Sequence, residues 1–132
     1  IQQFASTAGF VSGDKYFWNE QYTSALFQDY YPSVIRNATH VVDNLEGTEE
    51  VNTYAMALVV RTMALHRITD LYGDVPYTEA GRGLLGQEYW FPKYDTQESI
   101  YAQIVTDLKK ARDMMSASAP SPGNQDIYYR GN

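Results

Sequence analysis

The sequence predicts an all-α fold, in which antiparallel helices connected by one long loop form a bundle or a helical solenoid. Three stretches, residues 19–45, 48–72 and 96–117, place apolar residues at the three- and four-residue spacing of amphipathic helices. Glycine and proline, which interrupt helices, separate these stretches. A chain of 132 residues is long enough to bury a hydrophobic core of its own.

The first helical region, residues 19–45, follows a segment, residues 1–18, that we expect to be irregular. Pro32 lies inside the region and must either begin a new helix or kink a continuous one. Gly47 supplies the end. The second half carries an apolar stripe made of Val34, Ile35, Ala38, Val41, Val42 and Leu45.

The second helix is predicted to begin at Thr48 or Glu49 and to end at Leu71 or Tyr72. A helix that is apolar on most sides is packed on most sides, so we expect a central element. One face contains Val51, Tyr54, Ala55, Leu58, Val59 and Leu65, and the opposite face contains Met56, Val60, Met63 and Ala64.

The third helix, residues 96–117, follows a connection at residues 73–95 that is longer than most loops in compact domains. We expect that connection to be functional or to lie along the surface. Asp95 and Glu98 have the chemistry of a capping box at the start of the helix. The apolar face contains Ile100, Tyr101, Ile104, Val105, Leu108, Ala111 and Met115.

Composition excludes several classes of function. The net charge is −6 and the pI is about 4.7, which disfavours nucleic acid as a partner. The chain has no cysteine, which excludes disulfides, thiolate metal sites and cysteine catalysis. No apolar run approaches the ~20 residues of a membrane-spanning helix. The chain begins at Ile1 and ends at Asn132 within an expected loop, so we expect a fragment of a longer protein.

No catalytic or metal-binding set stands out. His66 and Asp70 are four residues apart on a helix, where a hydrogen bond is a better interpretation than a metal site without further histidine ligands. A phosphate-binding loop follows a strand and ends in Lys-Ser/Thr, and the glycine-rich segment at residues 81–86 has neither feature. We therefore interpret this segment as a flexible loop. The sequon at residues 37–39 falls inside a predicted helix and is assigned to chance.

Aromatic residues are the most informative population, with 12 tyrosines, 5 phenylalanines and 2 tryptophans. For any single ring, a core or interface position is the favoured interpretation, and stacking on the apolar face of a sugar is the alternative. We select Trp18, Tyr89 and Trp90 as candidate ligand-binding residues. Several rings lie outside the helical stripes, namely Tyr16, Phe17, Trp18, Tyr89, Trp90, Phe91 and Tyr94.

The segment HRITDLYGDVPY, residues 66–77, ends the second helix. Gly73 stands where a helix end requires positive φ, and Pro76 prevents continuation and keeps Val75 extended. We interpret the motif as structural and not catalytic, with Arg67 and Asp70 in packing and hydrogen bonding near the turn. Its members are Arg67, Asp70, Tyr72, Gly73, Asp74 and Pro76.

This motif, followed by Thr78-Glu79-Ala80, resembles that of SusD/RagB-type outer-membrane nutrient-binding lipoproteins of Bacteroidetes. The later segment FPKYDTQESIY, residues 91–101, with Ile104 and Asp107-Leu108 behind it, is similar to the family's next helix. The resemblance to the SusD-like branch extends to the opening segments, Phe4-Ala5-Ser6-Thr7, Gly13-Asp14-Lys15-Tyr16 and Tyr31-Pro32.

The resemblance implies antiparallel helix pairs of tetratricopeptide type with long loops, in which residues 1–132 form the N-terminal portion of a single larger SusD-like domain. It also implies a lipoprotein held by a lipid anchor on the extracellular face of the outer membrane. Because no catalytic or metal-binding set stands out, we expect a binding protein without enzymatic activity, cofactor or metal site. Its partner would be a SusC-like TonB-dependent transporter barrel, and its ligand a glycan or, in some members, a peptide. Family ligand residues follow no motif, so none is transferred by position.

Two other functions remain open at this point. A glycan-active hydrolase on a helical scaffold would use carboxylates near the aromatic residues, such as Asp14, Asp74 or Glu79. A scaffold whose helices bind only another protein is the third possibility.

Overall fold

A computed structural model describes residues 18–127 and residue 130, and it is helical as the sequence predicts. Val75 and Asp95 form an isolated antiparallel bridge, the one β pairing in this part of the chain. The segments Phe4–Thr7 and Gly13–Tyr16 lie outside the described residues. The elements are α1 (Glu20–Tyr30), the π-helical turn η2 (Tyr31–Ile35), α2 (Arg36–Leu45), α3 (Val51–Tyr72), the short 3₁₀ segment η3 (Gln87–Tyr89), α4 (Gln97–Met114) and the 3₁₀ segment η4 (Gly123–Gln125).

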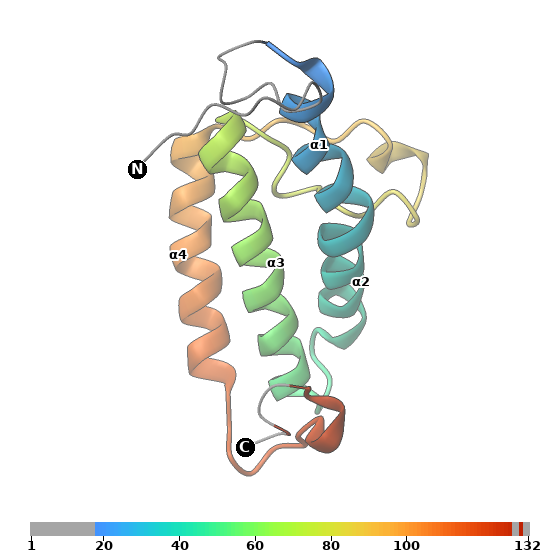
Figure 1. Cartoon of the computed structure of the whole chain (residues 1–132). Helices are drawn as coiled ribbons and strands as arrows, with labels where there is room; N and C mark the ends of the chain where they lie inside the picture. The colour runs from blue at the N-terminus through green and yellow to red at the C-terminus, as the bar shows by residue number, and fades with distance from the viewer. Residues whose placement is uncertain (1–17, 128–129, 131–132) are drawn as a thin grey trace, which may run out of the picture.

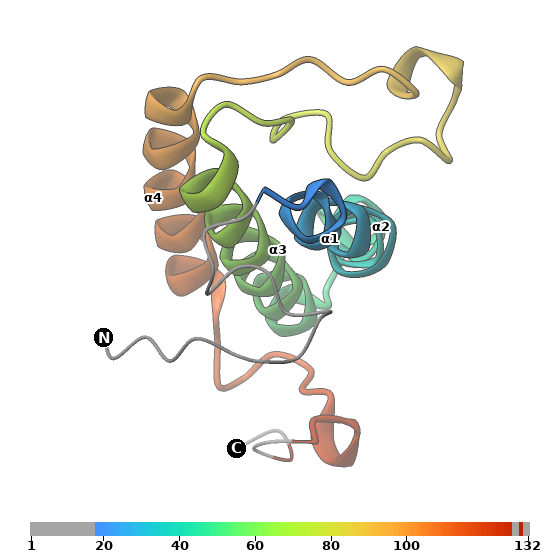
Figure 2. The same cartoon turned by 45° about the horizontal axis from the view of Figure 1, so that its top comes forward.

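The helices α2, α3 and α4 lie side by side in one layer, with α3 in the middle (Figure 1). The helix α1 continues α2 toward the end of the layer where α3 finishes (Figure 1). The long connection between α3 and α4 lies on one side of the layer (Figure 2). This arrangement confirms the expected antiparallel helices and the central place of the second helix.

Pro32 does not start a new helix. The chain passes from α1 into α2 without a break, through the π-helical turn η2. Proline has no N–H to donate, and a wider turn accommodates its ring where a regular α-helical turn would clash. At the start of α1, the side chain of Asn19 caps the helix by accepting a hydrogen bond from the Tyr22 N–H at 3.1 Å.

The boundaries of the other helices differ slightly from the prediction. The helix α3 begins at Val51, because the Thr48 hydroxyl donates to the Leu45 carbonyl and accepts from the Glu50 N–H, which keeps the preceding residues in a turn. It ends at Tyr72 as expected, and Gly73 has φ of 76°.

The predicted capping box at Asp95 and Glu98 is wrong. Thr96 is the N-cap of α4, and its hydroxyl accepts from the Ser99 N–H at 3.3 Å. The carboxylate of Asp95 is bound instead to backbone N–H groups of the long loop. At the other end α4 stops at Met114, short of residue 117, where the Asn52 side chain accepts from the Ser116 N–H and donates to the Ser116 carbonyl.

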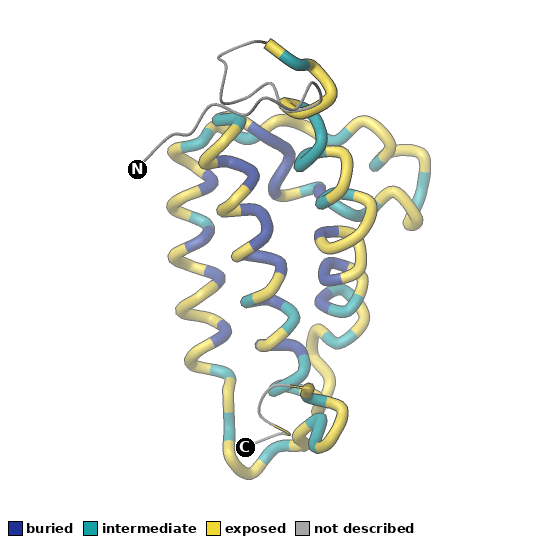
Figure 3. The backbone as a smooth tube through the Cα atoms, in the orientation of Figure 1, coloured by how far each residue is buried: buried dark blue, intermediate teal, exposed yellow. Residues whose placement is uncertain are grey.

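The helix α3 is central as predicted, but the expectation that it is packed on most sides is wrong for the described residues. One side of α3 is buried against α2, α4 and the long loop, and it includes Tyr54, Leu58, Leu65 and Ile68. On the opposite side Ala64 is buried, but the side chains of Met56, Val60 and Met63 are exposed. Figure 3 shows this division, with buried and exposed positions alternating along α3.

The apolar core has two clusters. The larger one surrounds the end of α3 and takes Val75, Tyr77 and Ala80 from the long loop; the smaller one lies at the other end of the layer. The loop is therefore more than a connection along the surface, because it supplies buried residues to the core. The larger cluster contains Ile35, Ala64, Leu65, Ile68, Val75, Tyr77, Ala80, Ile100 and Ile104.

Tyr77 is buried together with the polar side chains of Asp107 and Arg61. Its hydroxyl donates to Asp107 Oδ2 at 2.8 Å, and Gln103 donates to the other oxygen of Asp107 at 2.7 Å. The Arg61 guanidinium donates to the Tyr77 carbonyl at 2.9 Å and lies 5.4 Å from the ring centroid. Burial, together with the neighbouring Asp107, raises the pKa of Tyr77. These contacts fix the loop against both α3 and α4.

Asp95 holds the segment that follows Pro76. Val75 and Asp95 exchange two backbone hydrogen bonds, of 3.2 and 3.0 Å. In addition, Asp95 Oδ2 accepts from the N–H groups of Tyr77 and Thr78, at 2.9 and 2.8 Å. One carboxylate therefore satisfies two donors on the loop that have no helix or sheet partner.

The rest of the motif connects the end of α3 to the start of α4. Asp74 Oδ1 accepts from the Gln97 N–H, and the Gln97 side chain donates to the Thr69 carbonyl. Asp70 accepts a hydrogen bond from the Tyr101 hydroxyl. Arg67 is exposed on α3.

The glycine-rich segment is fastened to α2. Arg82 donates to both carboxylate oxygens of Asp43, at 2.9 and 2.8 Å. Gly81 has φ of 79°, and a Cβ at this position would come within 3.0 Å of the Arg36 Cα and the Thr39 side chain. Only glycine fits this approach without strain. The sequence-based interpretation of a flexible loop missed these contacts.

Replacement of Asp95 by Ala is expected to lower the free energy of unfolding by about 1–3 kcal/mol, because two loop N–H groups lose their acceptor. Asp95→Asn keeps one side-chain oxygen and is expected to cost less. Urea denaturation measures both. Equal losses for the two variants would contradict a role as acceptor.

The ion pair of Asp43 and Arg82 predicts a pH dependence of stability. The hydrogen bond from Arg82 lowers the pKa of Asp43 below its usual value. The contribution of this ion pair to the free energy of unfolding is therefore present above the unfolded pKa of Asp43, about 3.9. It is lost as the pH falls through the folded pKa of Asp43. Asp43→Asn is expected to be less stable than the parent at pH 7, by up to about 1 kcal/mol for a solvent-screened pair.

The difference between the parent and Asp43→Asn should shrink as the pH falls below about 4. Asp113→Asn is the matched control, because Asp113 pairs with its neighbour Arg112 on the surface of α4 and connects no elements. A difference for Asp43→Asn that is constant with pH would show that the charge is not the cause.

Candidate ligand-binding site

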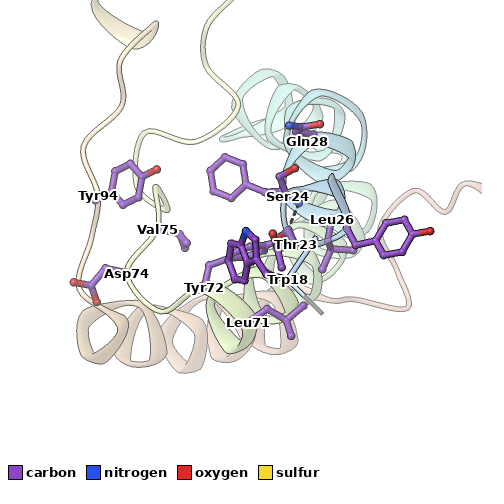
Figure 4. A pocket seen from close by; sticks show the side chains of 12 residues that line it. Trp18, Thr23, Ser24, Leu26, Gln28, Leu71, Tyr72, Asp74, Val75 and Tyr94 are labelled. Carbon is purple, nitrogen blue, oxygen red and sulfur yellow. Dashed lines mark hydrogen bonds between the residues drawn. The ribbon is translucent and has the colours of Figure 1, made fainter. Parts of the chain in front are cut away.

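A cavity of about 780 Å³ lies between the middle of α1, the end of α3 and the two ends of the long loop (Figure 4). Its position follows from the fold, because α1 extends to the end of the layer where α3 stops and the loop begins. The cavity is lined by Trp18, Tyr22, Thr23, Ser24, Leu26, Phe27, Gln28, Leu71, Tyr72, Asp74, Val75 and Tyr94.

The inner wall is aromatic and firmly held. The rings of Phe27 and Tyr72 meet edge to face, with their centroids 5.6 Å apart. The centroids of the Phe27 and Tyr31 rings are 4.4 Å apart. The Tyr72 hydroxyl donates to the Thr23 carbonyl at 2.6 Å and accepts from the Phe27 N–H at 3.3 Å. Tyr72 therefore fastens α1 to α3 by a side chain that also lines the cavity.

Tyr31 supports this wall from behind. Its hydroxyl donates to the Pro76 carbonyl at 2.7 Å, and burial raises its pKa. The hydroxyl thus stays protonated as a donor at physiological pH. The wall is connected through Pro76 to the segment that Asp95 holds.

The rim of the cavity is exposed and largely apolar. Trp18 is 82% exposed and Tyr94 is 65% exposed. Figure 4 shows these two rings on different sides of the opening, with Val75 between them. Ser24 and Gln28 are polar lining residues on α1, and the Ser24 hydroxyl also donates to the Gln21 carbonyl at 3.4 Å. Flat apolar surfaces with a few hydroxyl and amide groups suit a ligand that has both an apolar face and hydrogen-bonding groups.

Asp74 is the one carboxylate among the described lining residues, and Figure 4 shows its oxygens directed away from the centre of the cavity. Oδ1 already accepts from the Gln97 N–H at 2.9 Å. Glu79, the second carboxylate considered for hydrolysis, accepts from the Lys93 N–H at 3.0 Å. Asp14 lies outside the described residues. A glycosidase of the usual kind needs two carboxyl groups facing one bond.

The structure separates the candidate ligand-binding residues selected from the sequence. Trp18 lines the cavity, whereas Tyr89 and Trp90 lie at the 3₁₀ segment η3 on a part of the loop away from it (Figure 1). The Trp90 indole N–H donates to the Gly83 carbonyl at 3.2 Å, which connects the two arms of that loop. Tyr16 and Phe17 lie outside the described residues.

Sequence reasoning missed most of the cavity wall. Phe27, Leu71 and Tyr72 stand on helices, where an apolar residue is expected to belong to the core. Tyr94 was recognisable, because it lies outside the helical stripes. No local signal indicates that the end of one helix and the middle of another enclose a cavity.

The described residues contain no group of three or more His, Cys, Asp or Glu that could hold a metal ion. His66 and Asp70 do approach each other, with Nε2 and Oδ2 3.5 Å apart, on the exposed side of α3. No helix in residues 18–127 is both long and apolar enough to span a bilayer.

A family model described as "Starch-binding associating with outer membrane" matches residues 1–132. The chain belongs to this SusD-like family. No curated protein matches the sequence. The family resemblance and the helical fold expected from the two sequence motifs are both confirmed.

Two solved structures are similar to this SusD-like chain. One, titled a chitin-binding protein, is 32% identical with a TM-score of 0.78, and the match covers 89% of this chain and 24% of that one. The other, titled a Bacteroidetes SusD-like protein, is 30% identical with a TM-score of 0.74, and the match covers 88% of this chain and 20% of that one. The chain therefore spans a quarter or less of the length of these structures.

Tyr72→Phe is expected to loosen α1, because it removes the hydroxyl that bonds Thr23 and Phe27, at a cost of about 1 kcal/mol. Amide hydrogen exchange in α1 should become faster while exchange in α4 stays unchanged. Tyr101→Phe is the matched control, since that hydroxyl bonds Asp70 away from α1. Equal effects of both variants on α1 would contradict the assignment.

Proposed function

We propose that this SusD-like chain belongs to a protein that binds a glycan at the outer membrane through the cavity beside α1. The observation that carries the proposal is the pair of exposed rings, Trp18 and Tyr94, on the rim of an aromatic cavity. The family description, which names starch binding and the outer membrane, supports it. So does the solved structure titled a chitin-binding protein.

The chemistry of the cavity is compatible with a sugar chain. The C–H face of a pyranose ring is apolar and packs on an aromatic ring, whereas its hydroxyl groups need donors and acceptors at the edge. Trp18 and Tyr94 provide the aromatic rings, and Ser24 and Gln28 provide the donors and acceptors. Starch-like and chitin-like oligosaccharides are the two ligand classes to compare, and a peptide is the third.

A binding role fits these residues better than hydrolysis. Asp74 and Glu79 are engaged by backbone N–H groups, and only Asp74 lines the cavity among the described residues. Incubation of the native protein with starch- and chitin-derived oligosaccharides is the direct test. Release of new reducing ends by the purified protein would support the hydrolase instead.

We propose further that the full protein is a lipoprotein on the extracellular face and delivers its ligand to a SusC-like TonB-dependent transporter. Resemblance of the motifs at residues 66–77 and 91–101 to the SusD/RagB type supports this role. Detergent extraction followed by affinity purification of the native protein should recover a barrel protein in stoichiometric amount. A protein that is purified from membranes without any barrel would contradict it.

Trp18→Ala is expected to weaken oligosaccharide binding by about tenfold, which corresponds to about 1.4 kcal/mol. The physical reason is the loss of a flat stacking surface on the rim. Isothermal titration of the native protein with chitohexaose and with maltohexaose measures the loss and compares the two glycans. Trp18→Phe should retain part of the affinity.

Trp90→Ala is the matched variant, since Trp90 is also exposed but lies on the loop segment with Tyr89. A cavity site predicts less than about a twofold change. If Trp90→Ala lowers the affinity for the oligosaccharide and Trp18→Ala does not, the binding site is at Tyr89 and Trp90. Absence of binding for all glycans and peptides would favour a scaffold that binds only another protein.

A further inference from the structure

The layer of α2, α3 and α4 has a second face, opposite the long loop. On this face Val60 is 49% exposed and Met63 is 65% exposed. Two hollows of about 520 and 430 Å³ lie between α3 and the segment formed by the end of α1, η2 and α2. Val34 and Val60 line both hollows, so the hollows form one continuous groove.

The groove is apolar along most of its length. On α3 its wall extends from Ala57 to Arg67, which is about 15 Å at 1.5 Å per residue and equals about three helical turns. The apolar lining residues are Tyr30, Val34, Ala38, Val41, Ala57, Val60, Met63 and Ala64.

The same face continues onto α4. The rings of His66 and Tyr101 contact each other with centroids 5.8 Å apart, and the Tyr101 hydroxyl donates to Asp70. Tyr101 therefore lies beside the exposed side of α3. Val105 and Leu108 follow Tyr101 at i+4 and i+7, on the same stripe of the helix, and both are exposed.

Such a surface is unusual for the outer face of a helical repeat. Monomeric proteins rarely expose a contiguous apolar patch of this kind. In stacked helical repeats, the terminal face is polar, whereas an internal face is apolar and is covered by the next unit. The stripes of Val60 and Met63 and of Val105 and Leu108 have the character of an internal face.

We propose that this face is where further helices of the longer polypeptide pack. The matches to the two solved structures cover only 24% and 20% of those chains, so most of each structure has no counterpart in residues 1–132. The occupant is an amphipathic helix with apolar residues at i, i+3 or i+4, and i+7. It enters the groove between η2 and α3 at the usual helix spacing of about 8–10 Å.

A bilayer surface is a poorer occupant. Arg67 and Asp70 stand on the same exposed side of α3, where the groove ends, and ionic groups on a face oppose insertion into lipid. A helix can pair these groups with its own side chains. A second copy of the chain is the remaining occupant, and the experiment distinguishes it.

The test is the double variant Val60→Glu with Met63→Glu in the full native polypeptide. Two charges in a covered face should lower the thermal midpoint by about 5 °C or more. Leu84→Glu is the matched control, because Leu84 is equally apolar and is exposed on the loop. It should leave the midpoint unchanged.

A second measurement keeps the proposal testable when the double variant does not fold. Met63→Cys in the full polypeptide should react slowly with a maleimide, whereas Leu84→Cys should react quickly. Equal, fast labelling of both, or an unchanged midpoint for the double variant, would overturn the proposal. So would a native dimer, measured by light scattering, that the double variant converts to a monomer, because a second copy would then cover the face.

Discussion

The carboxylate of Asp95 is the contact on which the rest of the structure depends. It binds the N–H groups of Tyr77 and Thr78, in a segment where Pro76 prevents a helix and has no N–H of its own to donate. With this segment fixed, the Tyr77 hydroxyl donates a hydrogen bond to Asp107 on α4, and the Tyr77 carbonyl accepts one from Arg61 on α3. The loop thereby becomes part of the core, and the carbonyl of Pro76 becomes available to Tyr31 behind the cavity wall.

The sequence was sufficient for the existence of α2, α3 and α4, because each has an apolar stripe. Gly73 ended α3 where the positive φ requires it. Asp95 shows where local reasoning fails. Its position before a helix is typical of a cap, but two loop N–H groups compete for the same oxygens, and their approach depends on tertiary structure. Thr96, one residue later, has the hydroxyl that caps the helix.

The candidate site was predictable only in part, for a related reason. Trp18 stood out because it lies outside any helical stripe, and it does line the cavity. Phe27 and Tyr72 carry the same chemistry at helical positions, where core packing and cavity lining give identical patterns. Trp90 shows the converse, since an exposed aromatic residue in a loop also connects two arms of that loop through its indole N–H.

The π-helical turn at Tyr31–Ile35 determines more than the path past a proline. Each residue of a helix rotates its successor by about 100°, so one residue more or less in this turn would rotate α1 against α2 by that amount. The cavity wall stands on α1, whereas the contacts of Gly81 and Arg82 stand on α2. In this chain the length of this one turn therefore sets which side chains of α1 line the cavity. A single insertion or deletion there would change the lining without altering any lining residue.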